Sequence, residues 1–126
     1  MRTIFLVSCV ACFASLTNLA FANNEAVRTM ASITMKLNHF PSDSDKQKLE
    51  DIIKGDDSSE AEIAVASAIS NIEHQVPAAD KAKLKSIIED DSAPADLRQL
   101  ASVLLTINHR PSESDVGKLE AIVADN

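Results

Sequence analysis

Residues 101–123 read ASVLLTINHRPSESDVGKLEAIV, and closely similar stretches occupy 31–53 and 66–88. Neighbouring stretches are 35 residues apart, with no insertion. Seven positions keep the same residue in all three copies; in the first copy they are Ala31, Ser32, His39, Asp45, Lys48, Leu49 and Ile52. A fixed period of this length is typical of one supersecondary unit repeated along a chain.

Each repeat predicts two helices joined by a short turn. In the third repeat, Leu97, Leu100 and Leu104 follow one another at spacings of three and four, the pattern of an amphipathic helix. Pro111 then ends that helix, because proline lacks an N–H and restricts the residue before it. Ser112 is placed to cap the next helix.

The sequence therefore predicts an all-α fold of three tandem 35-residue helical hairpins, six helices in total. They are expected to stack as a short α-solenoid or as a compact helical bundle. The predicted domain covers 23–126, with repeats at about 26–60, 61–95 and 96–126.

The first 22 residues have the layout of a secretory signal peptide. Arg2 precedes a mostly apolar run from Ile4 to Leu19, and Ala20-Phe21-Ala22 places small residues before an expected cleavage at Asn23. Lipidation at Cys9 or Cys12 is a lesser alternative. The prediction is an exported protein, periplasmic or extracellular, whose mature chain does not span a membrane.

Removal of this leader would leave a mature chain of 104 residues without cysteine, in which Phe40 is the only aromatic residue. Its 11 basic and 19 acidic residues give a net charge of −8. This composition argues against nucleic-acid binding, which uses basic faces and stacking aromatics. Glycine-rich phosphate loops and a nucleophile elbow are also missing from the sequence, so we expect no enzymatic activity and no cofactor.

The repeated histidines His39, His74 and His109 are candidate ligands for zinc or copper. In a linear stack, equivalent residues lie about 8–10 Å apart, whereas zinc–nitrogen bonds are about 2.0–2.1 Å long. A structural interpretation therefore takes precedence: each histidine lies in the last turn of a first helix, where it bonds terminal carbonyls. The sequence thus predicts no shared metal site.

Lys48, Lys83 and Lys118 are candidate partner-binding residues, since they repeat on the second helices. Each follows an aspartate by three positions, so intrahelical ion pairs are the alternative. The favoured function is an exported helical-repeat module that binds an unidentified protein partner. The alternative is a periplasmic metal-responsive or pH-responsive protein that uses the repeated histidines.

Overall fold

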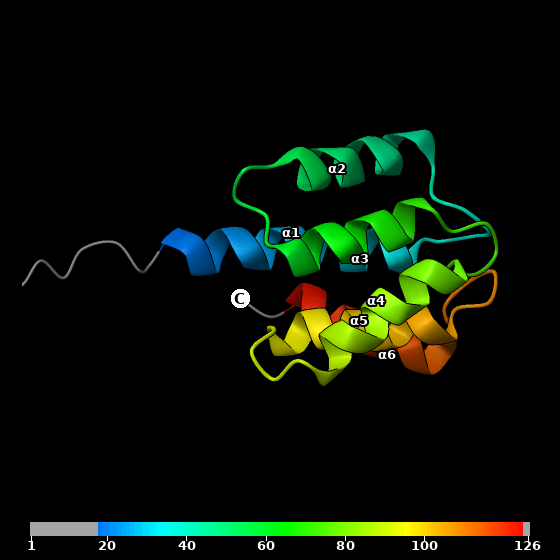
Figure 1. The fold of residues 1–126 in the computed structure, drawn as a ribbon. Helices are drawn as coiled ribbons and strands as arrows, with labels where there is room; N and C mark the ends of the chain where they lie inside the picture. The colour runs from blue at the N-terminus through cyan, green and yellow to red at the C-terminus, as the bar shows by residue number, and fades with distance from the viewer. Residues whose placement is uncertain (1–17, 125–126) are drawn as a thin grey trace, which may run out of the picture.

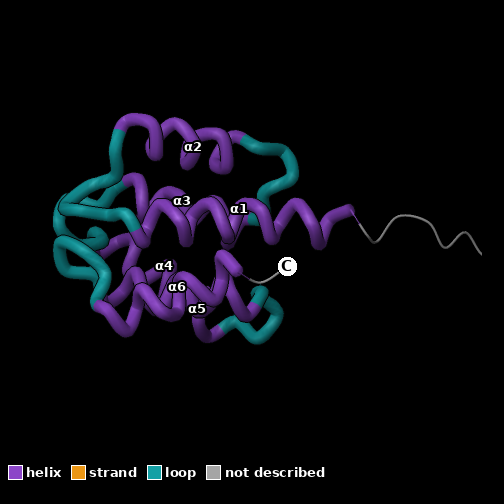
Figure 2. Tube along the Cα trace, turned by 180° about the vertical axis from the view of Figure 1, so that it is seen from behind, coloured by secondary structure: helices purple, strands orange, loops and turns teal. Residues whose placement is uncertain are grey.

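The computed structural model describes residues 18–124, and this part of the chain is all-α (Figure 1). Its six helices are α1 (Asn18–Met35), α2 (Asp43–Lys54), α3 (Glu60–Ser70), α4 (Ala78–Glu89), α5 (Ala95–Thr106) and α6 (Glu113–Ala124). Each repeat supplies two of them, as predicted. The loops within repeats gather at one end of the molecule, and those between repeats lie at the opposite end (Figures 1 and 2).

The three repeats close into a ring rather than extending as a linear stack. The most extensive helix contacts join the second helix of one repeat to the first helix of the next, α2 to α3 and α4 to α5. The pair α6 and α1 makes the same kind of contact and joins the last repeat to the first. Of the two predicted architectures, the structure therefore has the compact bundle, with approximate three-fold symmetry.

Main-chain hydrogen bonds close the ring a second time at the loop end. The N–H of His39 donates to the carbonyl of His109 (2.7 Å), and the N–H of His74 donates to the carbonyl of His39 (2.9 Å). The N–H of His109 donates to the carbonyl of His74 (2.7 Å). Each repeat thus gives one bond and receives one, which fixes the three loops relative to one another.

Equivalent residues of the three repeats contribute to the hydrophobic core. Leu49, Leu84 and Leu119 are fully buried. Ala31, Ala66 and Ala101 on the first helices are fully buried too, and these small side chains let neighbouring helices approach closely. Two of the seven identities that define the repeat in the sequence, the alanine and the leucine, are therefore core residues in every repeat.

The predicted caps are present in the first and third repeats. The Ser42 hydroxyl accepts from the N–H of Asp45, and the Ser112 hydroxyl accepts from the N–H of Asp115, both at 3.2 Å. In the second repeat, Pro77 precedes α4 without a side-chain cap, as expected.

Asp115 at the start of α6 has a lowered pKa. The main cause is the Ser112 hydroxyl, which donates to its Oδ2 at 2.7 Å, and the Lys118 ammonium adds to the effect. Because the folded-state pKa is below the ordinary value of about 3.9, the ionised carboxylate stabilises the fold above that pH, and this stability is lost as the pH falls through the folded-state pKa.

Replacing Asp115 with Asn is expected to lower the free energy of unfolding by about 1 kcal/mol near neutral pH. The difference from wild type should shrink as the pH falls below about 4, where both chains lack the charge. Denaturant unfolding across this pH range measures it. Glu120→Gln, on the exposed side of α6, is the matched control and should change little. A constant Asp115→Asn penalty at all pH values would contradict the assignment.

The predicted signal peptide falls mostly outside the described residues, as do Cys9 and Cys12. Helix α1 begins at Asn18 and so runs through the expected cleavage position before Asn23. Val27 of this helix is buried in the core, and a chain starting at Asn23 would retain it. Among residues 18–124, none of the helices combines the length and the apolar character needed to cross a membrane.

Candidate metal centre

The three histidines lie in the loops that follow the first helices, not in the last turns of those helices. Helix α1 ends at Met35, four residues before His39, and α3 and α5 end similarly short of His74 and His109. The predicted position within the helix is therefore wrong. The histidines do not bond the terminal carbonyls of their own helices; their main chains bond one another.

All three histidines have a left-handed backbone, with φ values of 74° for His39, 87° for His74 and 69° for His109. Among residues 18–124 they are the non-glycine residues with positive φ. This region costs an L-residue roughly 1–2 kcal/mol, and glycine or asparagine usually occupies it. Three imidazole side chains therefore stand where the backbone alone would favour glycine.

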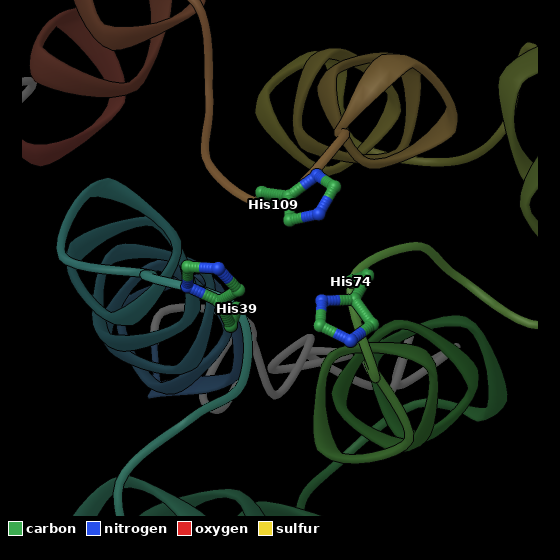
Figure 3. Close-up of side chains that lie close together, drawn as sticks. All are labelled: His39, His74 and His109. Carbon is green, nitrogen blue, oxygen red and sulfur yellow. The ribbon is translucent and has the colours of Figure 1, made fainter.

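This backbone turns the three imidazole rings toward one point (Figure 3). The ring centroids are 5.4 Å apart for His39 and His74, 5.1 Å for His39 and His109, and 4.8 Å for His74 and His109. The expected separation of about 8–10 Å is wrong because it assumed a linear stack. In a ring, the first and third repeats are neighbours.

One ligand nitrogen from each histidine lies within 4.8 Å of the other two. Even a triangle with 4.8 Å sides has its centre only about 2.8 Å from each corner. Small side-chain rotations, moving each nitrogen by about 0.7 Å, would reach the zinc–nitrogen bond length of about 2.0–2.1 Å. The arrangement therefore fits a single metal ion held by three nitrogens.

Neighbouring asparagines orient two of the imidazoles. The Nδ1 of His39 lies 2.9 Å from the Oδ1 of Asn38, and the Nδ1 of His109 lies 2.7 Å from the Oδ1 of Asn108. An amide oxygen only accepts, so each Nδ1 carries the proton and each Nε2 is left as the free electron-pair donor. Such a second hydrogen bond is the usual support of a metal-binding histidine.

The second repeat has Glu73 in place of this asparagine. Among the side-chain hydrogen bonds of residues 18–124, none joins Glu73 to His74, so this orienting contact is present in two of the three repeats. The residues before the histidines were not predicted to have a role, although the Asn-His pair at two of the three equivalent positions was a readable signal. Asn38 and Asn108 are therefore candidate site residues that the structure identifies and the sequence did not predict.

The histidine cluster is exposed to solvent at the loop end of the bundle. Among the described residues, it is the group of three or more His, Cys, Asp or Glu side chains that brings ligand atoms this close together. The acid pairs Asp56-Asp57 and Asp90-Asp91 take no part in it. Three protein ligands and an exposed approach leave a coordination position open to a further ligand.

The predicted intrahelical ion pairs of the three lysines are confirmed. The Nζ atoms of Lys48, Lys83 and Lys118 lie 3.9, 3.6 and 3.0 Å from carboxylate oxygens of Asp45, Asp80 and Asp115, respectively. Partner binding through these lysines stays a prediction. The three lysines lie on three separate helices, α2, α4 and α6.

A groove beside the histidines is a feature that the sequence analysis missed. It has a volume of about 450 Å³, and Phe40, Lys46, Glu73 and His74 are among its lining residues. Phe40 is 62% exposed, and it is the large hydrophobic side chain that the described part of the chain leaves exposed. Its place directly after His39, where the other repeats have polar residues, was the available signal.

Comparison with protein-family models, with curated proteins and with solved structures gives no match to this chain. What the site can do is therefore inferred from its own geometry and chemistry.

Proposed function

We propose that this protein binds one divalent transition-metal ion through His39, His74 and His109. One observation carries the proposal: three repeats each place an imidazole so that nitrogens from all three lie within 4.8 Å of one another. The positive φ at each histidine supports it, because a costly backbone conformation at a side-chain cluster is typical of a functional site.

The ligand set favours zinc or copper over calcium and magnesium. Neutral imidazole nitrogens suit Zn²⁺, Cu²⁺ and Ni²⁺, whereas Ca²⁺ and Mg²⁺ prefer oxygen ligands. Between metals of this group, a site of given geometry generally holds Cu²⁺ most tightly. Because a protonated imidazole cannot bind a metal, acidification is expected to release the ion. Metal binding at this site would therefore depend on pH, so the two alternatives predicted from the sequence, a metal-responsive and a pH-responsive protein, would share one site.

The proposed role is metal binding or buffering in an exported protein, without catalysis. The exposed cluster lets an ion enter and leave from solvent, unlike a closed structural zinc site. The acidic character of the chain, with a net charge of −7, also favours the approach of cations. Protein binding through Lys48, Lys83 and Lys118 stays a prediction, since each ammonium already has an aspartate partner.

Calorimetric titration of the metal-free full chain with Zn²⁺ and with Cu²⁺ tests the proposal. We expect one ion per chain, with protons released if any imidazole is charged at the start. Long-range ¹H–¹⁵N spectra should show all three imidazole rings shifting together in the same titration. Metal binding that leaves the three histidine signals unchanged, or the absence of binding, would contradict the proposal.

A further inference from the structure

The groove beside the histidines lies between the loops of the first and second repeats. His74, one of the three proposed metal ligands, forms part of its wall. Phe40, another lining residue, directly follows His39 in the chain. A ligand in the groove would therefore lie against His74, one of the proposed ligands of the metal. A lysine, Lys46, lines the groove as well.

Two residues that line this groove differ from those at the equivalent positions of the other two repeats. Phe40 is replaced by Gln75 and Arg110 at the equivalent positions, and Lys46 is replaced by Lys81 and Val116. Only the first repeat combines an aromatic ring with a lysine.

The lysine also differs in its surroundings. In the second repeat, the Lys81 ammonium donates a hydrogen bond to the Oε1 of Gln75 at 3.5 Å. Lys46 has the apolar Phe40 at the matching place and takes part in none of the ion pairs found among residues 18–124. Its side chain is exposed. A cation and an apolar ring therefore share one groove, and the ammonium is left for an incoming anion.

The charges and the apolar surface of the groove indicate which kind of ligand it would bind. A divalent ion held by three neutral imidazoles keeps its full charge, so it and Lys46 both attract an anion. Phe40, 62% exposed, offers an apolar surface to the rest of the same ligand. Glu73, which also lines the groove, opposes a second negative charge.

We propose that the groove binds a small monocarboxylate with an apolar or aromatic side group, and that its carboxylate fills the open coordination position of the metal. The apolar group packs on Phe40, and Lys46 pairs with the carboxylate. This inference rests on the proposed metal binding at His39, His74 and His109. It assigns that site a ligand class and explains why the first repeat departs from the other two.

The test uses the full chain loaded with Co²⁺, whose absorption spectrum reports on its ligands. Addition of phenylacetate is expected to change that spectrum at a concentration about tenfold lower than acetate requires. The alcohol 2-phenylethanol, which has the ring but no carboxylate, is expected to leave the spectrum unchanged.

The variants take their residues from the other repeats. Phe40→Gln should bring phenylacetate and acetate to nearly equal affinity, and Lys46→Val should weaken both acids severalfold. Arg110→Gln, at the equivalent position in the third repeat, is the matched control and should preserve the tenfold preference. Unchanged Co²⁺ affinity in each variant shows that the fold and the histidine cluster are intact.

The outcomes separate the two proposals. If Co²⁺ binds but no carboxylate changes its spectrum, the groove proposal is overturned and the metal site stands. An equal preference for phenylacetate in wild type and in Phe40→Gln also overturns it. If Co²⁺ does not bind, the metal proposal fails, and the groove proposal fails with it.

Discussion

Replacing His74 with Asn is expected to lower the zinc affinity of the protein by at least about 100-fold. Loss of a hydrogen-bonding partner of a ligand typically costs 10–100-fold in metal affinity, and loss of the ligand itself should cost no less. Asparagine is the suitable replacement because it tolerates the left-handed backbone of His74, with φ of 87°. The variant therefore removes the imidazole while keeping the conformation that the ring of main-chain hydrogen bonds requires.

A competition titration against a zinc-binding chromophore measures this loss. The same substitution at His39 and at His109 is expected to have a comparable effect, since the three rings occupy equivalent positions around one point. Asn38→Ala is the graded comparison: it removes the acceptor from the Nδ1 of His39 and should weaken zinc by about 10-fold. If all three histidine variants bind zinc as the wild type does, the metal site does not exist.

The six helices were predictable because their signals are local. The apolar spacing of Leu97, Leu100 and Leu104 identifies α5, and the Ser112 cap marks the start of α6. Ring closure is different, because it depends on the rotation between successive repeats. That rotation is set by the packing of α2 on α3 and of α4 on α5, and a periodic sequence fits a linear stack equally well.

The histidine cluster was missed for the same reason. Once each repeat turns by about a third of a circle, the loops of all three repeats meet at one end, and His39 becomes a neighbour of His109. The backbone conformation was also hidden, because a left-handed residue after a helix is usually signalled by glycine. A histidine at that position carries no such signal in the sequence.

The variation around the histidines argues for a role of the imidazoles themselves. The residue before the histidine is Asn38, Glu73 or Asn108, and the residue after it is Phe40, Gln75 or Arg110. The repeats have therefore diverged on both sides of a position that they keep, although its backbone would favour glycine. Core packing cannot explain the identity, because all three rings are exposed.

Zinc at about 100 times its dissociation constant is expected to raise the melting temperature of the protein by about 10 °C. A ligand that binds only the folded state at this excess stabilises it by about 2.7 kcal/mol. One kcal/mol corresponds to a shift of roughly 4 °C for a domain of this size. The three proposed ligands come from three repeats, so an ion held by them would tie the first repeat to the third at the junction where the ring closes.

Thermal melting followed by circular dichroism, with zinc and with a chelator, measures the shift. His74→Asn without metal should melt close to the metal-free wild type, because the imidazole is exposed and the backbone conformation is preserved. Adding zinc to that variant should move its melting temperature far less. Since the metal would act on the folded ring alone, an equal zinc-induced shift in wild type and variant would place the bound ion elsewhere and contradict the proposed centre.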